Sequence, residues 1–145
     1  MDKGIYCLVL KNPACTVQVG ALGPLSFKKG WHCYIGSALG SGGLKRLDRH
    51  FALFENKNKK PKWHIDYLLT EPRFSLEYAI FAATNERLEC ELARSLGGLG
   101  VDGFGCSDCS CPSHLLYRTH IPEKDITAAF SSLGLTSAKK TIISP

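Results

Sequence analysis

The chain has no long hydrophobic run. None of its segments approaches the roughly 18 consecutive apolar residues that a membrane-spanning helix requires. Its first residues also lack the basic stretch followed by an apolar stretch that marks a secretory signal peptide. We therefore expect a protein that is not inserted in a membrane and that remains in the cytoplasm.

Internal repeats and linkers are missing too. Hydrophobic residues make up 44% of the 145 residues and charged residues 21%, which is an ordinary globular composition. A chain of this length can bury one sizeable core. We predict one domain over residues 1–136, followed by a frayed tail over residues 137–145.

Acidic residues are in the minority. The chain has 13 Asp and Glu against 18 Lys and Arg, so its formal net charge is +5. This moderate positive charge is compatible with an anionic partner such as nucleic acid, but it does not identify one by itself.

Paired cysteines are not expected. The seven cysteines are an odd number in a chain without an export signal, and disulfides are rare in the reducing cytoplasm. We expect reduced thiols or metal ligands instead of a disulfide framework.

Short runs of strand-forming residues recur along the chain. Strands are predicted over residues 4–10, 16–19, 25–27, 31–36, 74–84 and 115–118. The second and third of these are expected to form a hairpin, and residues 63–69 fit either a helical turn or a strand. The predicted fold is α/β (α+β), with a small central antiparallel sheet flanked by helices and an extra hairpin inserted after the first strand.

Helical periodicity appears in two further segments. Residues 44–54 are predicted to form a helix whose apolar face is Leu44, Leu47, Phe51 and Phe54. Arg46 and His50 lie one turn apart on it and should project together. A last amphipathic helix is expected to open at Pro122.

Glu89 interrupts an otherwise apolar stripe. Residues 85–96 are predicted to form a helix with Asn85 as its N-cap and with Leu88, Leu92 and Leu96 along one face. Glu89 falls inside that stripe, whereas Glu91 falls outside it. Burying an unpaired carboxylate is costly. Glu89 is therefore either a partly exposed residue at the edge of the stripe, or a residue that needs a cation, a metal ion or a position at the rim of a cleft.

Two tripeptides, Gly4-Ile5-Tyr6 and Tyr34-Ile35-Gly36, lie in the first and fourth predicted strands. Together with the Arg46 helix and the Glu89 helix, they resemble the GIY-YIG nuclease superfamily. The resemblance implies that the two motif strands pair in a small antiparallel sheet. It also implies an essential arginine, and a glutamate that binds one divalent metal ion. The matching residues are Gly4, Ile5, Tyr6, Tyr34, Ile35, Gly36, Arg46, His50 and Glu89.

The connection between the two tripeptides is longer than is usual in that superfamily, and it holds the predicted hairpin. With this connection the chain is similar to the Uri branch of predicted endonucleases. The closer similarity is carried by residues 4–6, 19–20, 34–38, 49–50, 63–69, 89–93 and 103–115.

The resemblance implies a metal-dependent endonuclease that hydrolyses DNA phosphodiester bonds, in DNA repair or processing. Glu89 would hold Mg²⁺ or Mn²⁺, which prefer oxygen ligands, and Arg46 would contact the phosphate with its permanently charged fork. Tyr6 would orient or deprotonate the attacking water, and Tyr34 would hydrogen-bond in the same site. Since an ordinary phenol has a pKa of about 10, Arg46 and the metal would have to lower the pKa of Tyr6. His50 would relay a proton or contact the phosphate, or would simply lie on the helix surface.

Four basic residues, Lys45, Arg49, Lys59 and Lys60, are predicted to contact the nucleic-acid backbone. A solvated loop explains the lysines of residues 55–62 equally well. No motif specifies the strand form of the DNA, and none indicates a protein partner.

Four potential soft-metal ligands, Cys106, Cys109, Cys111 and His114, lie within nine residues of each other. Thiolates and imidazole bind tetrahedral Zn²⁺, and Cys90 is an alternative to Cys106 as the fourth ligand. The Cys-x-Cys spacing is unusual for a zinc knuckle, so a glycine-rich turn with reduced thiols is the alternative.

His64 and Asp66 form a further polar pair, set between Trp63 and Tyr67. They are either hydrogen-bonded structural groups or residues beside the site.

Two other functions remain open. The chain could be a non-catalytic nucleic-acid-binding module, or an interaction domain stabilised by zinc. The complete set of Tyr6, Tyr34, Arg46 and Glu89 favours the nuclease.

Overall fold

The computed structural model describes residues 2–105 and 111–141. Four strands precede the first α-helix, and helices and strands are mixed after it. The elements in chain order are β1 (Gly4–Asn12), β2 (Cys15–Gln18), the 3-10 turn η1 (Gly20–Leu22), β3 (Pro24–Phe27), β4 (Gly30–Ala38), α1 (Lys45–Asn56), α2 (His64–Leu69), β5 (Ser75–Ala83), α3 (Glu89–Leu96), β6 (Leu115–Arg118), α4 (Glu123–Ser132) and β7 (Ala138–Thr141).

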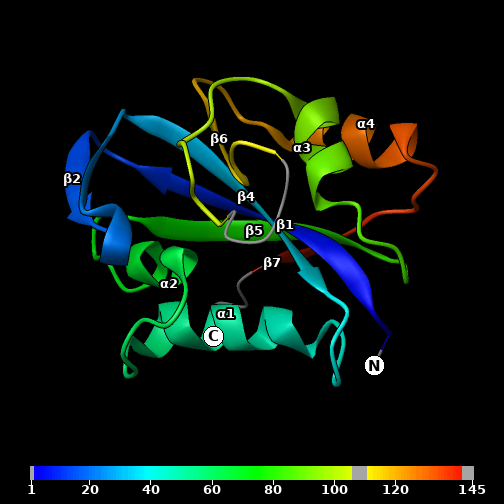
Figure 1. Cartoon of the computed structure of the whole chain (residues 1–145), viewed down its shortest axis with the longest axis horizontal. Coiled ribbons are helices and arrows are strands. Elements are labelled where there is room, and N and C mark those ends of the chain that lie inside the picture. Colours follow the sequence, from blue (N-terminus) through cyan, green and yellow to red (C-terminus); the bar gives the residue numbers. More distant parts are fainter. Residues whose placement is uncertain (1, 106–110, 142–145) are drawn as a thin grey trace.

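A five-stranded sheet forms the centre of the molecule. Its strands follow the order β6-β4-β1-β5-β7, and each neighbouring pair is antiparallel. Helices α1 and α2 cover one face, and α3 and α4 cover the other (Figure 1). The predicted α+β architecture, an antiparallel sheet flanked by helices, is therefore confirmed.

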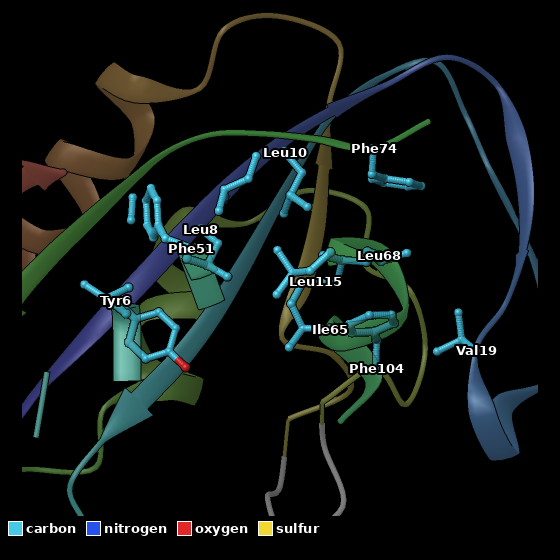
Figure 2. Packing of buried hydrophobic residues seen from close by; sticks show 14 of the residues in the cluster. Tyr6, Leu8, Leu10, Val19, Phe51, Ile65, Leu68, Phe74, Phe104 and Leu115 are labelled. Carbon is cyan, nitrogen blue, oxygen red and sulfur yellow. The ribbon is translucent and has the colours of Figure 1, made fainter. Parts of the chain in front are cut away.

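The central strand β1 supplies both hydrophobic cores because successive side chains of a strand point to opposite faces. Tyr6, Leu8 and Leu10 enter the core under α1 and α2, where Figure 2 shows them along one side of the strand. The intervening residues of β1, with Ile5 and Val9 among them, pack under α3 and α4. Burial on both faces explains why this strand reads as one continuous apolar run.

The hairpin predicted between the two motif strands is present. Strands β2 and β3 pair antiparallel as a separate two-stranded sheet. The two motif strands pair with each other as expected, and Tyr6 of β1 lies opposite Gly36 of β4.

The sequence allowed a helical turn or a strand over residues 63–69. In the structure His64–Leu69 form helix α2 and Trp63 is its N-cap. Asp66 decides the outcome, since its Oδ2 accepts the backbone N–H groups of Lys62 at 2.8 Å and Trp63 at 3.1 Å. These donors at the start of the helix would otherwise be unpaired.

The predicted start of the Glu89 helix is wrong. Helix α3 begins at Glu89 and not after Asn85. The hydroxyl of Thr84 accepts the N–H of Glu86 at 3.2 Å, which forms a local turn that competes with helix formation. The apolar face itself is confirmed, because Leu92 and Leu96 are buried.

The predicted frayed tail is also wrong for residues 138–141. These residues form β7, which pairs with β5 and extends the sheet. Two ion pairs secure β7, from Lys139 to Glu123 at 2.9 Å and from Lys140 to Asp48 at 3.4 Å. Residues 142–145 lie outside the described part of the chain.

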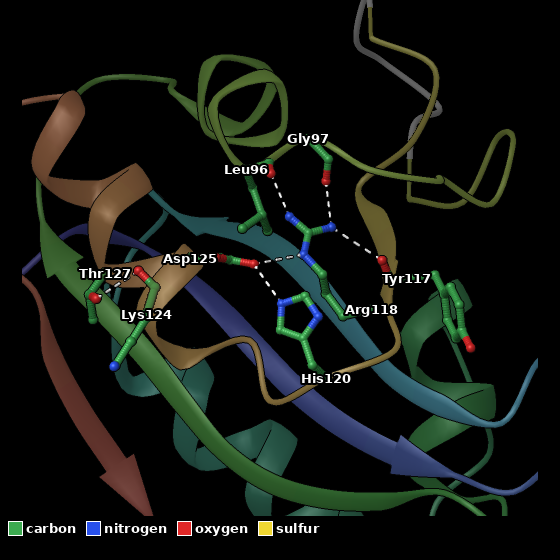
Figure 3. A network of polar contacts seen from close by, with 8 residues as sticks. All are labelled: Leu96, Gly97, Tyr117, Arg118, His120, Lys124, Asp125 and Thr127. Atoms are coloured by element: carbon green, nitrogen blue, oxygen red, sulfur yellow. Dashed lines mark hydrogen bonds and ion pairs between the residues drawn. The ribbon is translucent and has the colours of Figure 1, made fainter.

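Arg118 fixes α3 relative to the sheet. Its guanidinium donates to the carbonyl oxygens of Leu96 and Gly97 at the end of α3, and to Asp125 of α4 at 3.1 Å (Figure 3). The last carbonyls of a helix have no partner within it, so Arg118 satisfies them and joins three elements.

A search of the helices in the described residues found none with the length and apolar character needed to cross a membrane.

Candidate active site

A cleft of about 480 Å³ opens beside the second half of β4. Strand β6 pairs only with the first half, from Trp31 to Tyr34, so within the described residues β4 continues past the end of its neighbour. The start of α3 reaches this free edge from one face of the sheet, and α1 reaches it from the other. Residues of the sheet and of the helices on both of its faces therefore line one cavity. They include Tyr6, Tyr34, Ser37, Arg46, Trp63, Arg87, Glu89 and His114.

Gly36 makes room for Tyr6. A Cβ atom placed on Gly36 would lie 2.6 Å from the hydroxyl oxygen and from Cζ of Tyr6, which is closer than atoms can approach without displacement. The ring of Tyr6 therefore lies across the backbone of Gly36, and any other residue there would push it away. Glycine, which has no Cβ atom, permits this close approach of the Tyr6 ring to the backbone of residue 36.

Tyr6 and His50 form a buried pair. The Tyr6 hydroxyl lies 2.7 Å from Nε2 of His50, and each residue is 2% exposed. Burial raises the pKa of Tyr6 above its usual value, and the nearby Tyr34 adds to this effect, while Arg46 opposes it. Burial, followed by the charges of Arg46 and Arg49, lowers the pKa of His50 to about 3. Both groups are therefore uncharged at neutral pH.

This balance corrects the expectation for Tyr6. Arg46 does act to lower the pKa of the phenol, as predicted, but desolvation outweighs it and the net shift is upward. His50 is also not a helix-surface residue, since it lies buried against Tyr6.

Arg46 is oriented by two contacts. Its Nη1 donates to the carbonyl oxygen of Ser37 at 2.8 Å, a group on the free edge of β4. Its guanidinium carbon lies 5.1 Å from the centre of the Trp63 ring, within the range of a cation–π contact. The guanidinium is thereby held along the cleft wall with further N–H groups available.

Glu89 enters the cleft as the first residue of α3. Its Oε1 is buried and has no hydrogen-bond partner within the described part of the chain, whereas Glu91 is exposed. A buried carboxylate oxygen without a donor is costly. A divalent cation that prefers oxygen ligands fits this position.

The structure groups the predicted catalytic residues as follows. Tyr6, Tyr34, Arg46 and Glu89 line the same cleft. His50 contacts Tyr6 from behind and lines a neighbouring hollow of about 250 Å³.

The predicted nucleic-acid contacts divide into two groups. Arg49, Lys59 and Lys60 line the neighbouring hollow, together with Lys62. Lys45 is exposed on α1 and is not among the described residues that line either cavity.

His64 and Asp66 are structural groups. Asp66 caps α2, and Nδ1 of His64 accepts the backbone N–H of Gly105 at 3.0 Å. Both side chains are thus hydrogen-bonded, and Asp66 also lines the neighbouring hollow.

A second constellation borders the cleft. Cys90, Cys111 and His114 place their ligand atoms within 4.8 Å of one another, and Sγ of Cys90 lies 3.8 Å from Nε2 of His114. Burial lowers the pKa of His114, against the opposing charge of Glu89. These three side chains could hold a metal ion through two sulfurs and one nitrogen.

The expectation of no disulfide is wrong for one pair. Cys90 and Cys111 are bonded to each other, with their Cα atoms 5.5 Å apart. The chain returns to α3 just before β6 begins, which brings the two residues together despite 21 positions of separation. Of the other predicted zinc ligands, Cys106 and Cys109 lie outside the described residues.

Two functional candidates were missed at the sequence level. Trp63 lines both cavities, and Arg87 lines the main cleft. Trp63 had a detectable signal, because it stands next to the lysine-rich loop and directly before a helix. Arg87 lies in a turn whose shape depends on Thr84, and no sequence pattern indicates its direction.

Comparison with known proteins places the chain in a family. Residues 5–135 match the model described as domain of unknown function DUF123, so the chain belongs to that family. No curated protein matches it, and no solved structure does.

Proposed function

We propose that this DUF123 protein is a divalent-metal-dependent endonuclease of the GIY-YIG type that hydrolyses DNA phosphodiester bonds in DNA repair or processing. The observation that carries the proposal is the buried Oε1 of Glu89, which has no hydrogen-bond partner among residues 2–105 and 111–141 and lies in the cleft that also contains Arg46 and Tyr6. A carboxylate, a guanidinium and a neutral phenol at one cavity suit a reaction in which water attacks an anionic phosphorus centre.

Glu89 is the residue assigned to hold Mg²⁺ or Mn²⁺. When bound, such an ion supplies Lewis-acid polarisation of the phosphoryl oxygen and neutralises developing charge. Arg46 binds a phosphate oxygen through the N–H groups that Ser37 does not use. Because the guanidinium is already oriented, little freedom is lost when the phosphate arrives.

Tyr6 is assigned to orient the attacking water. Its raised pKa keeps the phenol protonated at neutral pH, so its hydroxyl can hydrogen-bond to water but is not itself a strong base. His50 fixes that hydroxyl at 2.7 Å, and Tyr34 also lines the same cleft.

The cysteine and histidine group is assigned to Zn²⁺ when its thiols are reduced. Two thiolates and one imidazole are ligands that zinc prefers, whereas Mg²⁺ avoids them. Zinc binding and the Cys90–Cys111 disulfide exclude each other, because a disulfide sulfur is not a thiolate. Metal content after reduction with a phosphine tests this assignment. Less than about 0.2 zinc per chain would remove it.

The nuclease proposal is tested by incubating single-stranded and duplex DNA with Mg²⁺ or Mn²⁺. We expect Glu89→Gln to lower the cleavage rate by about 100-fold or more, and Arg46→Ala to do the same. Glu86→Gln is the matched control, since Glu86 is exposed just before the same helix and is not among the described residues that line the cleft, and it should stay within about 3-fold of wild type.

Cleavage that persists in both Glu89→Gln and Arg46→Ala would contradict the assignment of these two residues to the active site. If wild-type protein binds DNA but cleaves neither DNA nor RNA, the protein is a binding module instead.

A further inference from the structure

Trp63 stands on the wall between the two cavities. It lines the main cleft with Arg46 and also lines the neighbouring hollow with Arg49. Trp63 is 37% exposed to solvent. Among the large hydrophobic residues that the structure describes as exposed, it is the aromatic one. An exposed indole beside two cavities calls for an explanation, because burying it elsewhere would be favourable.

Several contacts position Trp63 and its indole ring. The backbone N–H of Trp63 donates to Oδ2 of Asp66 at 3.1 Å. The guanidinium carbons of Arg46 and Arg49 each lie 5.1 Å from the ring centre, and the ring of His50 lies 6.1 Å away at 62°. A ring held this way loses little conformational entropy when a flat ligand packs on it.

The surroundings of the ring select an anion. Arg49, Lys59, Lys60 and Lys62 line the hollow next to it. The carboxylate in that hollow, Asp66, is buried and is already paired with backbone N–H groups. The combination of a basic hollow and an aromatic face is what a nucleotide requires, since its phosphate is anionic and its base is flat.

We propose that Trp63 is a stacking platform for one unpaired base next to the cleaved phosphate. The substrate class is therefore a single strand or a locally unpaired strand. The inference rests on the nuclease proposed for the adjoining cleft and names its substrate. In a continuous duplex both faces of each base are covered by its neighbours, so an indole reaches a base only where the strand is single or the base is flipped out. The basic hollow then holds the phosphates that follow along the strand.

Trp63 also has a structural alternative, which is to hold Arg46 and Arg49 in place. In that case its loss would weaken the binding of single-stranded and duplex DNA alike, because both present phosphates to the same guanidinium groups. A stacking role instead weakens single-stranded binding selectively. The ratio of the two affinities separates the roles.

The test measures binding of a short labelled oligodeoxynucleotide, single-stranded or annealed to its complement, in buffer with EDTA so that no cleavage occurs. Because Trp63 also contacts Arg46, its loss weakens both complexes, and we expect Trp63→Ala to raise the Kd for the single strand about 10-fold more than the Kd for the duplex. Trp63→Phe, which keeps an aromatic face, should retain most of the single-strand affinity.

Trp31 provides a matched control. It also lies under a cation, with Nζ of Lys11 5.2 Å from its ring centre, but it lines a different cavity. Trp31→Ala should leave both affinities unchanged. In a Trp31→Phe background the remaining tryptophan fluorescence comes from Trp63, and the single strand should quench it more than the duplex does.

Equal losses of single-strand and duplex affinity in Trp63→Ala, or no loss of either, would overturn the stacking role. If the wild-type protein cleaves DNA while Trp63→Ala keeps the same preference between strand forms, the stacking role fails and the nuclease stands. If nothing is cleaved but single-strand binding depends on Trp63, the nuclease fails and the stacking role stands.

Discussion

Tyr6 and Gly36 determine each other's position at the scale of single residues. The first motif supplies a phenol and the second supplies the missing side chain across from it. The two tripeptides are thus one packing unit, in which the glycine creates the space that the tyrosine fills. Two predictions follow from the burial of this unit.

Gly36→Ala should displace Tyr6 and lower the free energy of unfolding by about 1–3 kcal/mol, because the new methyl overlaps the phenol ring. Gly40→Ala is the control, since nothing lies within 4 Å of a Cβ atom placed there. Urea unfolding of both variants checks the difference. Equal stability of the two variants would show that Tyr6 does not lie across Gly36.

Tyr6→Phe should lower the free energy of unfolding by about 1–2 kcal/mol, because it leaves Nε2 of His50 buried without its 2.7 Å partner. Tyr78→Phe is the matched control. The hydroxyl of Tyr78 is buried without a hydrogen-bond partner in the described residues, so its removal should be neutral or stabilising. Thermal unfolding of the two variants measures the contrast, which would disappear if the Tyr6–His50 contact were absent.

At the scale of elements, the placement of α3 matters most, because this helix carries Glu89 at its first position. Packing of Leu92 and Leu96 holds the body of the helix, and Arg118 holds its end. Asp125 joins Arg118 and His120 in the network of Figure 3. The hydrogen bond from Arg118 makes the largest contribution to lowering the pKa of Asp125, and the hydrogen bond from His120 makes the next largest.

Arg118→Met should lower the free energy of unfolding by about 2 kcal/mol, since it leaves the last carbonyls of α3 unpaired. Arg94→Met removes an exposed arginine from the same helix, with only a 3.5 Å contact to Glu91, and should change stability by less than about 0.5 kcal/mol. Chemical denaturation measures both. Losses of similar size would contradict the capping role of Arg118.

Most elements could be predicted from the sequence, because each carries its own periodicity or turn signal. The predictions that were wrong or left open fall where a single side chain decides the local structure or where pairing depends on a distant edge. Thr84 delays the start of α3, and Asp66 selects a helix at α2. Strand β7 has a polar sequence whose pairing depends on the exposed edge of β5, which no local pattern reveals.

At the scale of the whole molecule, three buried histidines, His32, His50 and His114, couple stability to pH, because burial lowers the pKa of each. Burial lowers the pKa of His32 to about 4, and burial with nearby arginines lowers the pKa of His50 to about 3. Both values lie below the pKa of about 6.5 expected in the unfolded chain. The unfolded state therefore binds protons first, and stability is complete above about pH 6.5 and falls as the pH decreases.

Between pH 7 and 5.5 the free energy of unfolding should fall with a slope that approaches about 1.4 kcal/mol per pH unit for each histidine. His50→Gln should remove the part of this slope that comes from His50, about one third to one half of the total. Urea unfolding at several pH values measures it. A slope that is the same in wild type and His50→Gln would mean that His50 is not buried in its neutral form.

The sequence predicted the four main residues of the candidate site, but it did not predict the side chains that surround them. Tyr6, Tyr34, Arg46 and Glu89 were predicted, and they line one cleft. Trp63 and the contact between Cys90 and Cys111 were not predicted as they occur, because they depend on how α2 and the segment before β6 meet the sheet edge.

The most direct test of the account is the position of Mn²⁺ in crystals of the protein soaked with the ion, located by its anomalous scattering. We expect a peak at the carboxylate of Glu89, inside the cleft with Arg46 and Tyr6, and we expect this peak to disappear in Glu89→Gln. A peak at another site with the cleft empty, or one that is unchanged in Glu89→Gln, would contradict the assignment of Glu89 as the metal ligand.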